Sequence, residues 1–313
     1  MAIRKKEHNK QMRNKNSVDI SAFRHLYPFE SHYVKTNGLN YHYLDEGAGP
    51  PMLMVHGNPT WSFYFRNLVK AFSPRFRTIV PDHIGCGLSD KPDSSVYDYQ
   101  LRSRVDDLEN LMIHLDSKEK ITLIVHDWGG MIGMLYALRH PDKIARIVIT
   151  NTSGFFPPKS KGLPLRLWLV RNFVPFAVPA VLGLNLFSRA ALYMASRKGL
   201  ARDVRIGLEA PYNSWKNRIA TLKFVQDIPV TPKDPSYALV KYADENLHRL
   251  SDIPMLICWG QHDFVFDTAY LAEWQRRFPH AEVHEFPDAG HYVLEDAGDE
   301  VIAHIQDFLE RTG

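Results

Sequence analysis

Three residues along this chain have the types and the order needed for covalent catalysis: Asp127, Asp263 and His291. A carboxylate, a second acid and a histidine can serve as nucleophile, orienting acid and base. A carboxylate with a reference pKa of about 3.9 is ionised at neutral pH, so it can attack carbon without first losing a proton. Nucleophile, acid and histidine follow one another in the order typical of sheet enzymes whose strand loops meet at one edge. The pattern therefore predicts Asp127 as nucleophile, Asp263 as acid and His291 as base.

The surroundings of Asp127 predict a sharp turn from a strand into a helix. Residues 121–125 are apolar and β-branched, which is typical of a buried strand, and residues 131–138 are typical of an apolar helix. Such a nucleophile elbow usually exposes a serine that stands between two glycines. Here Asp127 replaces the serine, Val125 replaces the first glycine, and Gly129 fills the second glycine position.

Asp263 and His291 each follow a predicted strand in the last quarter of the chain. The carboxyl ends of neighbouring parallel strands meet at one edge of a sheet, so both loops are expected beside the elbow. Asp267 is a weaker alternative acid because it lies four residues further along. Glu295 lies one helical turn beyond His291 and is expected to face solvent.

Asn58 and Trp128 are the candidate donors that would stabilise a departing group. Asn58 lies in residues 56–60 (HGNPT), whose backbone can supply one N–H of an oxyanion hole, the other N–H coming from Trp128. The Asn58 amide and the Trp128 indole N–H are further donors suited to a departing halide or carboxylate. The alternative interpretation is that Trp128 only packs and that Asn58 only caps a turn or helix.

Alternating strand and helix patterns predict an α/β fold with a mostly parallel sheet flanked by helices on both faces. The predicted strands are 52–55, 78–80, 121–125, 144–150, 255–259 and 281–286, after an antiparallel pair that turns at Asn37-Gly38. The predicted helices are 61–72, 99–115, 131–138, 269–278 and 299–310. Between residues 154 and 250 the alternation stops and the pattern is helical, which predicts an inserted cap over the carboxyl ends of the strands. The expected domains are a core of 27–153 with 251–313, a cap of 154–250, and a disordered basic tail of 1–20.

Composition and charge disfavour a nucleic-acid-binding function. Hydrophobic residues make up 45% of the chain and charged residues 23%, which are ordinary values for a globular protein. Residues 1–17 hold six Lys or Arg, and the remainder holds 32 Lys or Arg against 34 Asp or Glu. The body of the protein is therefore slightly acidic, and a nucleic-acid partner is not expected.

The sequence also predicts no transmembrane segment, no cofactor and no metal. The most lipid-like stretch, residues 173–184, is shorter than the roughly 20 residues that span a bilayer, and two prolines interrupt it. It is a candidate for an assembly surface, in a homo-oligomer or a biosynthetic complex, or for a membrane-surface patch. The absence of a signal-peptide pattern and the presence of only Cys86 and Cys258 predict a cytoplasmic protein. No P-loop, G-x-G-x-x-G or zinc-ligand spacing occurs.

Three segments resemble the haloalkane dehalogenase branch of the α/β-hydrolases: residues 56–61 (HGNPTW), 81–90 (PDHIGCGLSD) and 126–130 (HDWGG). The resemblance extends over residues 27–309. It implies these roles: Asp127 as nucleophile, His291 as base, Asp263 as acid, and Asn58 with Trp128 as the leaving-group clamp. One subgroup of the family instead carries its acid as a glutamate after the sixth strand. Residues 149–152 (ITNT) hold no carboxylate there, which favours Asp263.

Within that branch, residues 211–221 (PYNSWKNRIAT) and 224–229 (FVQDIP) are most similar to bacterial β-lactone decarboxylases of long-chain olefin biosynthesis, and also to the third haloalkane dehalogenase subfamily. The resemblance implies an enzyme that acts on a hydrophobic small molecule without a cofactor. The reaction it favours is decarboxylation of a cis-β-lactone to a long-chain olefin. Hydrolytic dehalogenation, from alkyl halide to alcohol and halide, is the alternative.

Two further alternatives stay open. An epoxide hydrolase would need two cap tyrosines to hold the epoxide oxygen, and nothing in their spacing singles out a pair. The candidates are Tyr193, Tyr212, Tyr237 and Tyr242. A non-catalytic ligand-binding protein on the same fold would be expected to lack a triad member, whereas all three are present. A serine esterase is disfavoured because no G-x-S-x-G occurs.

Overall fold

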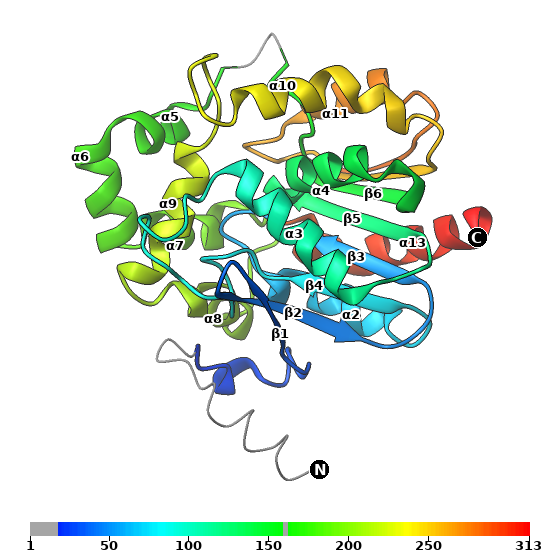
Figure 1. Ribbon diagram of the computed structural model, residues 1–313, viewed down its shortest axis with the longest axis horizontal. Coiled ribbons are helices and arrows are strands. Elements are labelled where there is room, and N and C mark those ends of the chain that lie inside the picture. Colours follow the sequence, from blue (N-terminus) through cyan, green and yellow to red (C-terminus); the bar gives the residue numbers. More distant parts are fainter. Residues whose placement is uncertain (1–17, 159–161) are drawn as a thin grey trace.

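The computed structural model describes residues 18–158 and 162–313, in which one sheet of eight strands forms the centre of the molecule (Figure 1). The strands are β1 (His32–Thr36), β2 (Leu39–Glu46), β3 (Pro51–Val55), β4 (Arg77–Pro81), β5 (Ile121–Asp127), β6 (Ile144–Thr152), β7 (Met255–Gly260) and β8 (Glu282–Phe286). Their spatial order is β1-β2-β4-β3-β5-β6-β7-β8. Strand β2 is antiparallel to β1 and β4, and all other neighbours are parallel. The predicted mostly parallel sheet is confirmed.

Successive residues of the central strands point to opposite faces of the sheet, and each face carries its own apolar core. In β5, Leu123 and Val125 belong to one core and Ile124 to the other. The first core also contains side chains of helices α3, α4 and α11, and the second contains those of α2, α12 and α13. These helices are α2 (Arg66–Phe72), α3 (Leu101–Leu115), α4 (Trp128–Arg139), α11 (Thr268–Arg277), α12 (Val293–Asp296) and α13 (Gly298–Thr312). Burial on both faces explains why the strands read as continuous apolar runs.

The chain between β6 and β7 forms helices that gather beside the sheet (Figure 1). They are α5 (Leu165–Asn172), α6 (Val174–Ala177), α7 (Leu186–Met194), α8 (Arg202–Glu209), α9 (Ile219–Gln226) and α10 (Tyr237–Asn246). Ala177, Val181, Leu182 and Leu222 form a small apolar cluster of their own within this segment. We propose that residues 154–250 are the cap and that 27–153 with 251–313 are the core.

Two sequence expectations concern the ends and the apolar stretches of the chain. The predicted disordered tail of residues 1–20 lies, up to residue 17, outside the described residues. In the described part of the chain, no single helix has both the length and the apolar character needed to cross a membrane. Helix α5 together with Val174–Gly183 passes that test only as a pair, and the two are bent by 97°.

Candidate active site

Asp127 is the last residue of β5 and immediately precedes α4. Its backbone has φ of 52°, a left-handed conformation that a non-glycine residue adopts at a cost and that is typical of functional sites. The turn is tight enough to exclude neighbouring side chains: a Cβ at Gly57 would lie 2.0 Å from Asp127 Oδ1, and one at Gly129 would lie 1.9 Å from the Val55 carbonyl oxygen. The sharp strand-to-helix turn at Asp127 is therefore present, and Gly129 is required there for space.

The Asp127 carboxylate is buried between backbone donors on one side and a histidine on the other. The backbone N–H of Asn58 donates to Oδ1 at 2.5 Å, and the backbone N–H of the next residue, Trp128, lies near enough to lower the pKa of the carboxylate. Oδ2 lies 3.7 Å from His291 Nε2, which is beyond hydrogen-bonding distance. Burial raises the pKa of Asp127 above its ordinary value, and the two N–H donors and His291 counteract part of that rise.

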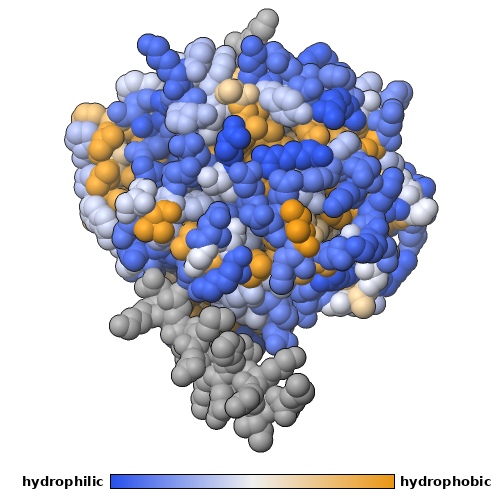
Figure 2. Space-filling view, viewed as in Figure 1, coloured by the Kyte–Doolittle hydropathy of each residue, from blue (hydrophilic) through white to orange (hydrophobic). Residues whose placement is uncertain are grey.

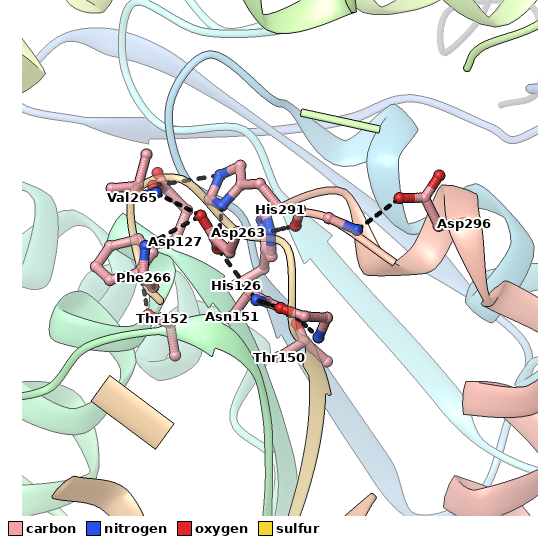
Figure 3. A network of polar contacts seen from close by, with 12 residues as sticks. His126, Asp127, Thr150, Asn151, Thr152, Asp263, Val265, Phe266, His291 and Asp296 are labelled. Carbon is pink, nitrogen blue, oxygen red and sulfur yellow. Dashed lines mark hydrogen bonds and ion pairs between the residues drawn. The ribbon is translucent and has the colours of Figure 1, made fainter. Parts of the chain in front are cut away.

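Asp263 and His291 lie together beside this carboxylate, at the carboxyl ends of β7 and β8 (Figure 3). His291 Nδ1 donates to Asp263 Oδ2 at 2.7 Å, so Nε2 faces Asp127. The other oxygen of Asp263, Oδ1, accepts the backbone N–H groups of Val265 at 2.7 Å and Phe266 at 3.0 Å. The structure thus brings the three predicted triad residues into one cluster, with the histidine between the two carboxylates.

The charge state of His291 follows from opposing effects. Its burial lowers the pKa, but the charge and hydrogen bond of Asp263 and the charge of Asp127 raise it, and the net pKa lies above the ordinary value. The His291 backbone is held as well, because the ring of buried His126 donates from Nε2 to the His291 carbonyl oxygen at 2.9 Å (Figure 3). The base is therefore fixed through both its ring and its backbone.

Asn151 and Asp296 take part in the site, and sequence reasoning did not identify either. Asn151 Nδ2 donates to Asp263 Oδ2 at 3.1 Å and to the Gly260 carbonyl oxygen at 3.0 Å, so it helps to orient the acid. Asp296 accepts the backbone N–H of Gly290 at 2.8 Å, next to His291 (Figure 3). The sequence could have indicated Asn151, because it lies at the end of β6, level with the ends of β5 and β7. No feature of the sequence indicated a role for Asp296.

The other acids considered from the sequence lie elsewhere. Asp267 accepts the backbone N–H of Ala269 at 3.0 Å and caps the start of α11. The expectation that Glu295 faces solvent is wrong: its side chain is 7% exposed and its two oxygens accept from Arg66 at 2.5 and 2.8 Å. Glu295 lies on the short helix α12 that follows His291, and it is directed inward because its carboxylate pairs with buried Arg66 at the start of α2.

The two predicted leaving-group donors, Asn58 and Trp128, line the same pocket as Asp127 and His291. The Asn58 amide donates one of its two hydrogens to the Thr221 carbonyl oxygen of α9 at 3.0 Å, which leaves one hydrogen for a ligand. The Trp128 ring lies against the ring of Phe224, with centroids 5.4 Å apart. The helical segment between β6 and β7 therefore positions both side chains, a relationship that motif spacing does not reveal.

The pocket above Asp127 has a volume of ≈ 350 Å³ and is lined mainly by apolar side chains. Helices α5, α6 and α7 contribute the residues Leu167, Leu169, Val170, Phe176, Leu186, Phe187, Ala190, Ala191 and Met194 to its wall. Asp127, His291, Asn58 and Trp128 are among the few polar side chains that line it. An apolar cavity with a few convergent polar groups suits a hydrophobic ligand with one reactive polar centre.

The geometry gives less support to an epoxide hydrolase. None of Tyr193, Tyr212, Tyr237 and Tyr242 lines the pocket, so no pair of them can hold an epoxide oxygen above Asp127. Tyr212, for example, is buried and donates to the Thr60 carbonyl oxygen. In the described residues, no group of three or more His, Cys, Asp or Glu could hold a metal ion.

Comparisons with known proteins agree with this arrangement. Residues 50–298 match the family model for the alpha/beta hydrolase fold. The haloalkane dehalogenase DatA of Agrobacterium tumefaciens shares the fold, with a TM-score of 0.80 over 91% of this chain and 97% of that chain at 23% identity.

Sequence relatives are closer. The chain is 54% identical to cis-3-alkyl-4-alkyloxetan-2-one decarboxylase of Shewanella oneidensis, over 92% of this chain and 90% of the relative. It is 44% identical to the protein of the same name in Xanthomonas campestris, over 88% of this chain and 93% of the relative. Haloalkane dehalogenase 2 of Mycobacterium tuberculosis is 31% identical, over 95% of this chain and 100% of the relative. The chain therefore belongs to the α/β-hydrolase fold family, in the branch that contains the cis-3-alkyl-4-alkyloxetan-2-one decarboxylases and the haloalkane dehalogenases.

Proposed function

We propose that this protein is a cis-β-lactone decarboxylase, which converts a 3,4-dialkyl oxetan-2-one into an alkene and carbon dioxide. The observation that carries the proposal is the 54% identity to the Shewanella oneidensis decarboxylase over 92% of this chain. The site supports it chemically, because a buried carboxylate faces an apolar pocket with neutral donors beside it. In the proposed catalytic set, Asp127 is the nucleophile, His291 and Asp263 complete the triad, and Asn58 and Trp128 hold the departing group.

In the first proposed step, Asp127 opens the strained ring by displacement at carbon 4. A carboxylate oxygen of Asp127 bonds to carbon 4, while the bond from carbon 4 to the ring oxygen breaks and its electron pair stays on that oxygen. The product is an alkyl ester of Asp127 that carries a free carboxylate on carbon 3. The Asn58 amide and the Trp128 indole N–H are the donors for that carboxylate. Displacement of halide from an alkyl halide is the same kind of step, except that the halide is released as a free ion, whereas the carboxylate stays attached through carbon 3.

In the second proposed step, the ester fragments without water. The bond from carbon 3 to its carboxylate breaks and releases carbon dioxide, and that electron pair forms the double bond to carbon 4. The ester bond from carbon 4 to Asp127 breaks at the same time, which regenerates the carboxylate. The cycle therefore consumes no water, no proton and no cofactor. His291, whose pKa is raised, can stay protonated beside Asp127 and stabilise the returning negative charge.

Gas chromatography of products formed from a cis-3,4-dialkyl β-lactone tests the proposal, with Asp127→Asn as the control. Displacement inverts carbon 4, and fragmentation from the anti arrangement then gives a cis alkene. We expect cis alkene from the unmodified enzyme and none above background from Asp127→Asn. If no alkene forms with the unmodified enzyme, while a haloalkane is hydrolysed, the decarboxylase proposal is overturned in favour of dehalogenation.

Dehalogenation is the second candidate because relatives named haloalkane dehalogenases are 31% identical over nearly the whole chain. In that reaction, Asp127 would displace halide and His291 would activate water to attack the resulting ester. We propose a cytoplasmic location for either activity. The support for it is that Cys86 and Cys258 are both free thiols buried in the core.

A further inference from the structure

Exposed apolar side chains are concentrated in residues 162–202, which we call the docking segment. This segment includes α5, α6 and α7. Among the described residues, eight of the sixteen large hydrophobic side chains that are exposed belong to it, including Val174 at 51% and Leu184 at 62%. Figure 2 shows apolar side chains at the edge of the molecule where Figure 1 places α6. Concentrated exposed apolar surface is typical of an interaction site.

The charge of the docking segment indicates what it contacts. Residues 162–202 hold six Lys or Arg and no Asp or Glu, although the chain holds 35 acids in total. The side chains of Arg166, Arg197, Lys198 and Arg202 are exposed, and none of them forms an ion pair with another described residue. A surface that combines exposed apolar side chains with unpaired cations matches a bilayer with anionic headgroups, where cations meet phosphates and apolar groups enter the acyl boundary.

The same segment also forms the rim of the substrate pocket. Residues that both line the pocket and are exposed lie mostly in it: Pro164, Arg166, Phe176, Leu186 and Ala190. The mouth of the cavity is therefore framed by exposed apolar groups of the docking segment and by one of its cations, Arg166. A protein docked through this surface would open its pocket toward the lipid rather than toward water.

We propose that residues 162–202 dock onto the surface of an anionic lipid bilayer, with the pocket mouth facing the acyl chains. Apolar substrate then enters from the bilayer and apolar product returns to it, a consequence that rests on the proposed function. The contact is interfacial, since no single helix in the described residues can span a membrane. Two exposed apolar residues of the segment that do not line the pocket, Val174 and Leu184, are suitable test positions.

Co-sedimentation of the full-length protein with lipid vesicles tests the docking. The vesicles are phosphatidylcholine alone, or phosphatidylcholine mixed with phosphatidylglycerol. We expect binding to the mixed vesicles that weakens as salt is added, because surface attraction is screened. We expect Val174→Ser/Leu184→Ser to lower the partition coefficient about tenfold or more. The matched control is Val96→Ser/Ile113→Ser, which replaces side chains 67% and 64% exposed outside the segment and should bind like the unmodified protein.

Three results would overturn the docking proposal. The first is equal binding to both kinds of vesicle. The second is unchanged binding of Val174→Ser/Leu184→Ser, which would mean that another part of the chain, such as the six Lys or Arg of residues 1–17 that every variant keeps, accounts for the binding. The third is a smaller particle mass for that variant in light scattering with unchanged vesicle binding, which would identify the segment as an interface between copies.

Activity measurements then separate docking from the reaction itself. With lactone placed in the mixed vesicles, alkene formation by Val174→Ser/Leu184→Ser should fall about tenfold. With detergent-dispersed lactone the variant should match the unmodified enzyme, because neither residue lines the pocket. Equal rates from vesicles would overturn the entry route. If the unmodified enzyme forms no alkene in either format, the proposed function fails, whereas the co-sedimentation result still decides the docking.

Discussion

Asn151 and Asp263 share a hydrogen bond of 3.1 Å between the ends of β6 and β7, and the same Asp263 oxygen accepts His291 Nδ1 at 2.7 Å. Asn151 also bonds both the N–H and the carbonyl oxygen of Gly260, so it joins the two strand ends. In the subgroup of the family that carries its acid after the sixth strand, a carboxylate is expected near this position. Residue 151 is therefore directly hydrogen-bonded to the orienting acid, Asp263.

This relationship predicts that the acid can be moved. Asp263→Asn should lower the activity strongly, because the amide no longer stabilises a protonated His291. Asn151→Glu/Asp263→Asn should recover about tenfold over that single variant, since a glutamate is one methylene longer than asparagine and can reach toward the imidazole. Initial rates of alkene formation measure both variants. A double variant no more active than Asp263→Asn would show that residue 151 cannot orient the base.

A methyl group at Gly57 should abolish activity. The added Cβ would lie 2.0 Å from Asp127 Oδ1, so the carboxylate or the loop that carries the Asn58 N–H must move. Loss of one oxyanion-type donor alone costs about 10²–10³ in rate, and we expect at least that loss for Gly57→Ala. Gly298→Ala is the matched control, because nothing lies within 4 Å of a Cβ there. Similar rates for the two variants would contradict the close approach.

The central sheet and the triad could be predicted because they depend on local patterns. The strands are buried on both faces, so apolar runs identify them, and loops at the carboxyl ends of parallel strands must lie together. The sequence alone does not explain how Val125 fits at the first glycine position of the elbow, and the structure does. A Cβ at Gly133 would lie 2.6 Å from Val125 Cγ1, so the space that Val125 occupies is left by a glycine on α4.

What the sequence could not predict depends on contacts between distant segments. Thr221 of α9 holds the Asn58 amide, and Asp296 holds both the His291 loop and the backbone of Arg197 and Lys198. No local pattern encodes the contacts of Asn58 with Thr221 or of Asp296 with residues 197–198, because about a hundred residues or more separate the partners. The contact of Asp296 with Gly290 spans only six residues, but it depends on how the loop after β8 folds back. Glu295 was misplaced for the same reason, since spacing alone showed only that it follows His291 by one turn.

The Arg66–Glu295 pair predicts a large stability cost when one partner is removed. Both side chains are buried, and the guanidinium forms two hydrogen bonds to the carboxylate. Glu295→Leu leaves an uncompensated buried cation and should lower the free energy of unfolding by about 3–5 kcal/mol. Arg66→Met/Glu295→Leu removes both charges and should recover most of that loss. Urea unfolding measures the three proteins, and a double variant as unstable as Glu295→Leu would contradict the explanation.

Turnover in water enriched in oxygen-18 should separate the two candidate reactions at Asp127 itself. Fragmentation breaks the bond between carbon 4 and the Asp127 oxygen, so both carboxylate oxygens are retained and the residue stays unlabelled. Hydrolysis of an alkyl ester adds water at the carboxyl carbon, so Asp127 gains the heavy isotope. We expect no label with a β-lactone substrate after many turnovers. Mass spectrometry of the peptide that contains Asp127 measures it, and a labelled peptide would contradict the water-free second step.

The pH dependence of the two reactions should differ because they need different charge states. Alkene formation needs Asp127 ionised, and its raised pKa places the acid limb of that rate above the ordinary aspartate value. Haloalkane hydrolysis also needs neutral His291, and its raised pKa places that acid limb above the ordinary histidine value.

As the pH falls, hydrolysis should therefore be lost first, while alkene formation continues until Asp127 itself is protonated. The measurement is kcat against pH for a β-lactone and for a haloalkane with the same enzyme, because His291 acts on the ester intermediate after halide has left. Mutation provides the check, because Asp263→Asn removes the main cause of the raised His291 pKa and should shift any hydrolysis limb to lower pH. Coincident acid limbs for the two substrates would mean that His291 must be neutral in both reactions, which would contradict its role as a protonated partner during fragmentation.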